Sequence, residues 1–510
     1  METLKRYGNI LIFTCIIIEM LIWPSMNNFF GCLMTAISWI IFSKIGLNEQ
    51  VIREHVFAWL VFMTMSLYRI MPLIATMIEG HSIGYNLVLP LSTYLGETLL
   101  YFISALAFYL AINCKKTLVS LKRILFRCGF YDQISNKTIW CIGILGFGIY
   151  VYIVSRNIEF GDVIGKTLAG FLYLRLAPLL LFFPVLTKNE SNKVVVYNPY
   201  ALFYLILLII VAFATNRRSE ILGPICTLFL LFCLSYINCG KTIRHTINKK
   251  HIVCGILTVV FLFPVINDIS LAMLYNRAFR EDISKTELFR RTMNTFLDKE
   301  KMETLHLIAE KKELKESTLS MDNKKVWSEA YVKNFVLNRY CNLKVTDNTL
   351  YHAKRVGFPN DVMYNNFFYE MCILLPTPIL NFLGLDYGKN EYYSSGDRLR
   401  ALSFNRHPHR SHLITSNLAD GLLTFGYWYF PIEFLLFFVR FLFLDTFSFK
   451  YKGYIFYSIL GLMTIFNFMA MGIHAGGCSD SLQYMLRGYW QDVILFIIAF
   501  TFIKKITTRL

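Results

Sequence analysis

The sequence predicts an all-α, polytopic integral membrane protein with about twelve transmembrane helices and one large outer loop. Of its 510 residues, 55% are hydrophobic and only 17% are charged, and the mean hydropathy is +0.47. Soluble globular domains carry about 25% charged residues, so this balance excludes an ordinary soluble enzyme. Apolar stretches recur along almost the whole chain, and an aromatic content of 16% is typical of proteins with interfacial aromatic belts.

The candidate spans follow from the thickness of a bilayer, whose hydrocarbon core of about 30 Å needs roughly 20 apolar residues per helix. Their centres are Ile17, Ser38, Thr64, Ile103, Leu145, Pro178, Leu207, Leu228, Val259, Phe434, Ile465 and Ile497. Lys and Arg collect in alternate connections, above all between Lys115 and Lys137. By the positive-inside rule, this pattern places both termini in the cytoplasm.

One long outer segment interrupts this alternation. It covers residues 267–411, between a first bundle of nine spans (residues 1–266) and a second bundle of three (residues 412–510). Residues 284–317 combine Glu and Lys with apolar residues at helical spacing, which predicts a soluble amphipathic helix. The apolar stretch Met371–Leu385 is short and interrupted by proline, so a re-entrant or membrane-surface segment is expected there.

The net charge and the cysteine content bear on two further questions: whether nucleic acid is a partner, and whether disulfides hold the fold together. The net charge of +17 comes chiefly from the inner connections, where anionic lipid headgroups account for it, so nucleic acid is not required. The 12 cysteines form no disulfide framework, because about half of them lie in spans. Cys341 and Cys372 either form an outer disulfide or remain free thiols.

Two groups of cations lie on the outer side, where the topology rule does not explain them. Arg217 and Arg218 end the seventh span. They either snorkel to headgroups beside a helix cap or bind an anion such as phosphate or pyrophosphate. The planar guanidinium group suits the second role, because its donors contact an oxyanion in pairs.

The second group precedes the tenth span, within residues 397–412. Its members are Arg398, Arg400, Arg406, His407, His409, Arg410 and His412. The imidazoles could bind zinc, but the interleaved arginines would repel a divalent cation, which leaves a solvated loop or an anion site as the favoured interpretations. Arg339 is a weaker candidate of the same kind.

Charged residues within spans are costly and usually face a partner or a cavity. Arg69 and Arg175 either pair with Glu19 or Glu97 or line a polar pocket. Asp420, at the start of the tenth span, is either a general base or a charge that favours the helix N-terminus.

Four features make the chain resemble a known family. The seventh span ends Ala214-Thr215-Asn216-Arg217-Arg218, a large outer loop comes late in the chain, and a Gly-containing helix with aromatic residues and proline covers residues 416–431. Gly426 also lies fourteen residues after His412. In these features the chain resembles the Wzy-type O-antigen polymerases, or oligosaccharide repeat-unit polymerases. The His-to-Gly spacing is shared with O-antigen ligases, although Leu413 stands where ligases have Asn.

The resemblance implies a GT-C-like fold in a bacterial inner membrane, with its active site on the outer face. It implies transfer of a growing glycan from undecaprenyl diphosphate onto a new lipid-linked repeat unit, without a metal ion or other cofactor. A chain-length regulator is a further candidate partner. The groups expected to bind diphosphate or glycan are Arg217, Arg218, Arg339, Arg406 and Arg410. The candidates for the general base are His412, His409 and Asp420.

Three other membrane functions remain open. The first is a transporter or flippase of lipid-linked glycans, although the nine-plus-three layout lacks the two similar halves common in transporters. The second is an O-antigen ligase, which uses the same donor chemistry. The third is a transferase using polyprenyl-monophosphate sugars, although the first outer loop, residues 24–28, has no carboxylate pair.

Overall fold

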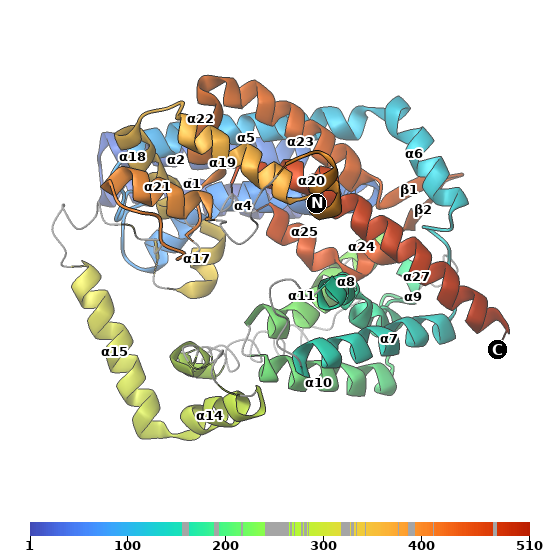
Figure 1. Cartoon of the computed structure of the whole chain (residues 1–510). Helices are drawn as coiled ribbons and strands as arrows, with labels where there is room; N and C mark the ends of the chain where they lie inside the picture. Colours follow the sequence, from blue (N-terminus) through green and yellow to red (C-terminus); the bar gives the residue numbers. More distant parts are fainter. Residues whose placement is uncertain are drawn as a thin grey trace. The chain divides into compact units, whose positions relative to one another are not determined.

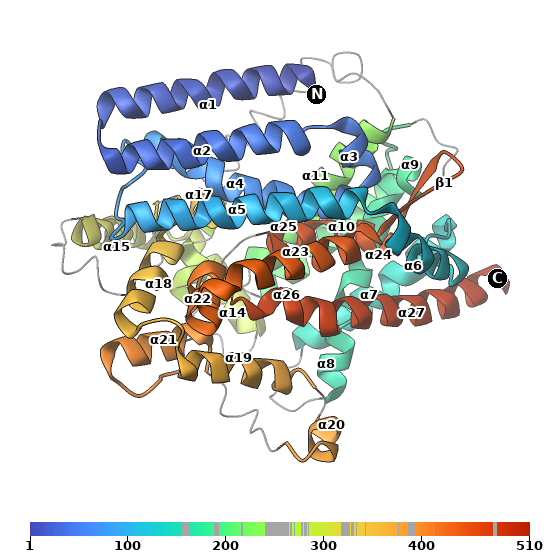
Figure 2. The ribbon, with the colours of Figure 1, turned by 90° about the horizontal axis from the view of Figure 1, so that it is seen from above.

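In its described residues, the computed structural model is mainly helical and contains one β-hairpin, and the chain divides into two compact units (Figures 1 and 2). Unit 1 comprises Met1–Lys122, Leu319–Phe447 and Asn467–Gln491, and unit 2 comprises Arg123–Thr318, Ser448–Phe466 and Asp492–Leu510. The structure describes all residues except 156–162, 188–192, 216–217, 240–264, 266–267, 270, 277–278, 280–282, 284, 318–326, 328–330, 333, 342, 376, 386–392, 412, 473–476 and 510.

Long helices make up the N-terminal part of unit 1. They are α1 (Glu2–Ile22), α2 (Met26–Ile45), α4 (Val56–Ile78) and α5 (Pro90–Asn113), with the short α3 (Glu49–Glu54) between α2 and α4. Figure 2 shows α1, α2 and α5 as aligned, neighbouring helices, and α5 also packs against α23 (Tyr429–Asp445). Helix α6 (Lys115–Arg127) follows α5 and crosses the boundary into unit 2.

Shorter helices from the later sequence complete unit 1. They are α17 (Phe335–Cys341), α18 (Leu343–Val356), α19 (Asp361–Ile373), α20 (Thr377–Phe382), α21 (Ser395–Phe404), α22 (Asn417–Phe425), the 3₁₀ turn η4 (Gly426–Trp428), α26 (Ser479–Gln483) and the π-helical turn η5 (Tyr484–Gly488). Helix α25 (Ile465–Met471) begins in unit 2 and continues in unit 1. The last helix, α27 (Tyr489–Arg509), begins in unit 1 and continues in unit 2.

Unit 2 is organised around α7 (Asn136–Ser155) and the 3₁₀ helix η1 (Leu172–Phe182). Glycines allow their close approach, because a Cβ atom at Gly146 would lie 2.2 Å from the backbone nitrogen of Arg175. The Tyr204 hydroxyl fastens the pair by donating to the carbonyl oxygens of Gly143 at 3.0 Å and Arg175 at 2.8 Å. The other elements are α8 (Val163–Ala169), α9 (Pro184–Thr187), α10 (Pro199–Ala214), α11 (Arg218–Asn238), α14 (Lys285–Leu297), α15 (Lys299–Ser317), β1 (Ser448–Tyr451), β2 (Tyr454–Tyr457) and α24 (Ile459–Met463).

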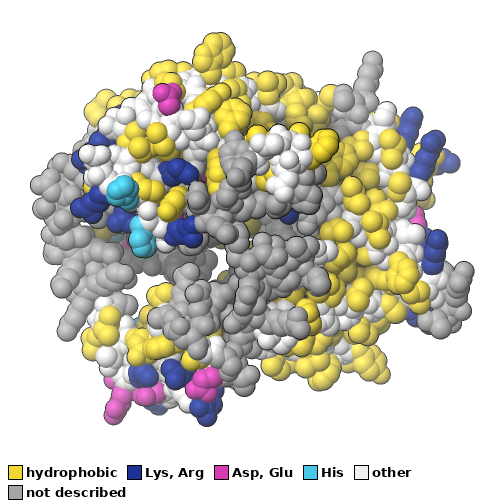
Figure 3. Space-filling model, in the orientation of Figure 1, with side chains coloured by type: hydrophobic (Ala, Val, Ile, Leu, Met, Phe, Trp, Pro, Cys, Tyr) yellow, Lys and Arg dark blue, Asp and Glu magenta, His cyan; other side chains and the backbone are white. Residues whose placement is uncertain are grey.

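Seven described helical segments are long and apolar enough to cross a bilayer. They are Met26–Ile45, Val56–Ile78, Pro90–Asn113, Asn136–Ser155, Glu220–Asn238, Asn417–Asp445 and Ser479–Thr507. Figure 3 shows apolar side chains over much of the visible surface, and residues such as Phe102, Leu435 and Ile498 are more than half exposed. So much exposed apolar surface suits contact with lipid rather than water. The prediction of an all-α membrane protein is therefore confirmed.

The number twelve stays a prediction. The apolar helices at the sixth and seventh predicted centres, Thr167–Phe182 and Pro199–Phe213, are shorter than a typical span. Around Ile465 the chain is divided between α24 and α25, and Val259 lies outside the described residues.

The predicted outer segment contains packed helices. The expected amphipathic helix over residues 284–317 is two helices, α14 and α15, because Asp298 ends the first and caps the second by accepting a hydrogen bond from the Lys301 backbone N–H at 3.1 Å. The interruption expected in the stretch 371–385 is present, since α19 ends at Ile373 and α20 begins at Thr377.

Helix α18 is an element of the predicted outer segment that the sequence does not single out. Its composition is polar, yet nearly all of it is buried against α5, α21 and α22. The Thr346 hydroxyl donates to Glu97 Oε1 at 2.6 Å, and Asp347 Oδ1 accepts from the Leu89 backbone N–H at 2.6 Å. Thr349 Oγ1 lies 2.9 Å from Ser416 Oγ. Such bonds offset the cost of removing polar side chains from water.

Candidate functional site

A cationic loop, residues 405–411, lies on the surface of unit 1 after α21. Arg406, His409 and Arg410 are exposed in it. On the face drawn in Figure 3, His and Lys or Arg side chains gather where Figure 1 places α21. The loop therefore presents positive charge to solvent, and the two interpretations of this segment, a solvated loop and an anion site, both stay open.

Buried contacts hold the cationic loop against α21. The Asp397 carboxylate, on the first turn of α21, is 3% exposed, and its Oδ1 accepts from the backbone N–H groups of Ser411 at 3.2 Å and Leu413 at 3.3 Å. The Ser394 hydroxyl donates to the Leu413 carbonyl at 2.8 Å. Gly396 permits this approach, because a Cβ atom there would lie 2.4 Å from the Leu413 carbonyl oxygen.

The Tyr393 ring lies next to the guanidinium groups of both Arg398 and Arg410. The guanidinium carbons of Arg398 and Arg410 lie 5.7 Å and 5.5 Å from its ring centroid, within range for cation–π attraction. The Arg398 Nε is buried and has no hydrogen-bond partner among the described residues. Two guanidinium groups on one ring form an arrangement suited to an oxyanion, which would accept hydrogen bonds from their N–H groups.

Two buried carboxylates, Glu370 and Asp420, lie beside the turn at residues 478–479. Asp420 Oδ2 accepts from the Cys478 backbone N–H at 2.9 Å, and Glu370 Oε2 accepts from the Ser479 hydroxyl at 2.7 Å. Glu370 Oε1 also accepts from the Ser395 hydroxyl at 3.0 Å. Because Ser395 begins α21, hydrogen bonds connect this carboxylate pair to the element that anchors the cationic loop.

Asp420, predicted as either a general base or a helix-start charge, is 3% exposed and holds the 478–479 turn. Sequence analysis missed Glu370. The available signal was its isolation, because Glu370 is the only charged residue between Asp361 and Asp386.

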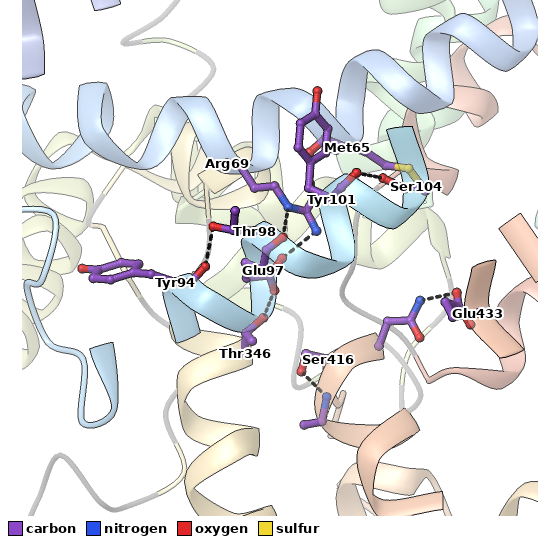
Figure 4. Close-up of polar contacts among 12 residues, drawn as sticks. Met65, Arg69, Tyr94, Glu97, Thr98, Tyr101, Ser104, Thr346, Ser416 and Glu433 are labelled. Carbon is purple, nitrogen blue, oxygen red and sulfur yellow. Dashed lines mark hydrogen bonds and ion pairs between the residues drawn. The ribbon is translucent and has the colours of Figure 1, made fainter. Parts of the chain in front are cut away.

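A second polar group lies on α22 and α23. The Asn417 amide donates to Glu433 Oε1 at 2.9 Å and accepts from the Tyr429 hydroxyl at 3.0 Å (Figure 4 shows the Glu433 contact). Two turns along α23, Arg440 donates to the Ser481 hydroxyl at 3.1 Å and to the Met471 carbonyl at 2.9 Å. These intramembrane charges were also missed, and their signal was the same: single charged residues in an apolar span.

The in-span charges that the sequence did single out find partners. Arg69 and Glu97 form a fully buried ion pair, with Nη2 and Oε2 2.7 Å apart (Figure 4). In unit 2, Arg175 pairs with Glu220, whereas Glu19 in unit 1 accepts from the Ile83 backbone N–H at 2.8 Å. Of the pairings considered, Arg69 with Glu97 is the one observed.

The remaining predicted residues are less fully described. His412 and Arg217 lie outside the described residues. Arg218 begins α11 in unit 2 and Arg339 lies in α17 in unit 1, but their side chains are not described. The structure therefore brings together His409, Arg406 and Arg410 in one loop, and it connects Asp420 to them only through the hydrogen-bonded elements above.

Comparisons with models of protein families, with curated proteins and with solved structures find no match to this chain.

Proposed function

We propose that the protein is a GT-C-like membrane glycosyltransferase that polymerises undecaprenyl-diphosphate-linked repeat units into an O-antigen or related surface polysaccharide. The observation that carries this proposal is the cationic loop with Tyr393. It presents exposed Arg and His side chains on a helical unit whose spans are apolar enough for a membrane. A substrate with a lipid tail and a diphosphate needs both features at once.

The chemistry requires stabilisation of a leaving diphosphate. The acceptor hydroxyl oxygen would form a bond to the anomeric carbon of the growing glycan while the bond from that carbon to the diphosphate oxygen breaks. The diphosphate leaves with the bonding electron pair, and guanidinium groups at Arg406 and Arg410 would offset its charge. A base would take the hydroxyl proton, for which His409, His412 and Asp420 are the candidates.

A transporter of lipid-linked glycans is the second candidate. The buried ion pair between Arg69 and Glu97, each in a candidate span, favours it, because intramembrane charges commonly mark transport paths. The two candidates differ in what accumulates when the protein is removed.

The test compares glycan length on a gel from cells lacking the protein and from cells complemented with it or with Arg406→Ala, Arg410→Ala or Arg290→Ala. Arg290 is the matched control, because it is an exposed arginine on α14, outside the cationic loop. For a polymerase, deletion leaves single repeat units, and the wild type and Arg290→Ala restore a ladder. Either variant of the cationic loop should shorten that ladder strongly.

Two results would contradict the proposal. Full-length glycan from the stably expressed double variant Arg406→Ala/Arg410→Ala would show that the cationic loop is not needed to bind the diphosphate. Complete loss of surface glycan on deletion, with lipid-linked repeats trapped on the inner leaflet, would instead support the transporter.

A further inference from the structure

Two residues one helical turn apart on α18 carry buried polar atoms that have no hydrogen-bond partner among the described residues. Asn348 is 1% exposed and His352 is fully buried. Neither amide atom of Asn348, Nδ2 or Oδ1, has a hydrogen-bond partner among the described residues, and the same holds for His352 Nε2. Positions i and i+4 lie on the same face of a helix, so these three atoms belong to one surface of α18.

Such a group calls for an explanation, since buried polar atoms in folded proteins are almost always hydrogen-bonded. The neighbouring polar residues of α18 follow that rule. Thr346 bonds to Glu97, and Thr349 pairs with Ser416. The three unpaired atoms lie on one face of a helix whose neighbouring polar groups are satisfied, so a single ligand could pair with all of them.

The surroundings of His352 fix its orientation. Its Nδ1 lies 2.7 Å from the Ser403 hydroxyl oxygen on α21, which leaves Nε2 as the atom available to a ligand. The Trp327 ring stacks on the imidazole with centroids 5.2 Å apart and planes at 21°, and Phe404 packs at 5.3 Å. Trp327 itself is only partly buried.

The chemistry of the three atoms selects a hydroxyl-bearing ligand. The Asn348 amide needs one acceptor and one donor, and two neighbouring hydroxyl groups supply both. A hydroxyl also pairs with His352 Nε2 in either tautomer, because it can donate or accept. An ionised phosphate oxygen could not donate to the Asn348 Oδ1, and a metal cation could not accept from Nδ2.

We propose that Asn348, His352 and Trp327 form a subsite for a neutral sugar residue of the glycan, an assignment that rests on the proposed polymerase or glycan-handling function. In this structure the two α18 side chains are covered. Binding therefore requires the Trp327 indole to leave the His352 ring and to stack on the apolar face of the sugar.

The charge state of His352 agrees with a neutral ligand. Burial lowers the pKa of His352 to about 4, and the nearby cations Arg355, Lys344 and Arg400 act in the same direction. The imidazole is therefore uncharged at neutral pH and adds no attraction for an anion. Lys344 forms an ion pair with Asp347 at 3.0 Å, so its charge is already balanced.

The test uses the full-length protein in lipid nanodiscs and saturation-transfer difference NMR. The probes are glucose, galactose, mannose and N-acetylglucosamine, each added separately, with inorganic phosphate as the competitor. We expect the wild type to bind at least one of these sugars and phosphate not to displace it. Asn348→Leu should weaken binding by at least about tenfold without lowering the apparent melting temperature, because methyl groups replace two unpaired atoms.

Thr349→Val is the matched control, since it removes a satisfied hydroxyl from the same helix. It should lower the melting temperature and leave sugar affinity unchanged. If Asn348→Leu does not fold, His352→Gln serves in its place.

Three results would overturn the subsite. They are no sugar binding by the wild type, equal binding by the wild type and the folded variant, and displacement of the sugar by phosphate. The outcome is separable from the proposed function. An intact glycan ladder in cells that lack the protein would refute the polymerase function even if sugar binds at this subsite. Loss of the ladder in those cells, together with no sugar binding by the purified protein, would refute the subsite alone.

Discussion

Removal of Arg69 should destabilise unit 1 severely. The Arg69 and Glu97 side chains are both fully buried, and three contacts join Arg69 to its surroundings: Nη2 to Glu97 Oε2 at 2.7 Å, Nε to the Glu97 carbonyl at 2.8 Å and Nη1 to the Met65 carbonyl at 2.7 Å (Figure 4). In Arg69→Met, the Glu97 carboxylate stays buried and keeps the Thr346 hydroxyl as its described donor. Breaking a buried ion pair in this way costs about 3–5 kcal/mol.

The double variant Arg69→Met/Glu97→Leu distinguishes the cause. It removes both charges, and a buried ion pair replaced by apolar groups of similar size is often close to neutral in stability. We therefore expect the double variant to be more stable than Arg69→Met alone. The coupling energy from the double-mutant cycle should be at least about 1 kcal/mol.

The assay is the apparent melting temperature of purified protein in detergent, followed by size-exclusion chromatography after heating. A loss of about 3–5 kcal/mol should lower it by on the order of 10 °C. If Arg69→Met melts within about 2 °C of the wild type, or if the double variant is the less stable of the two, the stated desolvation reasoning is wrong.

Two further predictions concern unit 1. The pKa of His352 is lowered to about 4 by burial, so between pH 4 and about 6.5 the unfolded chain binds a proton that the folded protein excludes. Stability should therefore be full above about pH 6.5 and fall by about 3 kcal/mol as the pH approaches 4, and melting curves should show a steeper acid loss for the wild type than for His352→Phe. Equal slopes would contradict this. Gly421→Ala should also destabilise unit 1, because its Cβ would lie 2.1 Å from the Tyr429 ring. Gly148→Ala is the control and should not lower the melting temperature, because its Cβ would have no heavy atom within 4 Å. Equal melting temperatures for the two variants would show that the contact with Tyr429 does not limit the residue at position 421.

The seven helical segments that are long and apolar enough to cross a bilayer could be predicted, because the length and hydrophobicity of such a helix are properties of the local sequence. The cationic loop could be predicted for a related reason, since Arg, His and Pro at close spacing do not form an apolar span. Arg69 and Glu97 stood out as charges in apolar stretches, which made pairing between them one of the expected outcomes.

The burial of α18 could not be predicted. Its sequence, Leu343–Val356, is polar, and a polar helix in an outer segment is expected to face water. Its burial depends on partners far along the chain, such as Glu97 for Thr346 and Ser416 for Thr349, which satisfy the hydroxyl groups in the interior. The role of Glu370 in holding Ser395 and Ser479 was hidden in the same way.

By itself, the sequence determined the helical class, most of the described spans and the location of the exposed cations, because these depend on local hydrophobicity and charge. Only the tertiary structure decided which polar groups are buried and how Glu370 and Asp420 come to share one turn. It also decided that the amide atoms of Asn348 and the Nε2 atom of His352 have no hydrogen-bond partner among the described residues. The physical reason is that hydrogen-bond satisfaction in an interior depends on contacts between distant segments, which local composition does not encode.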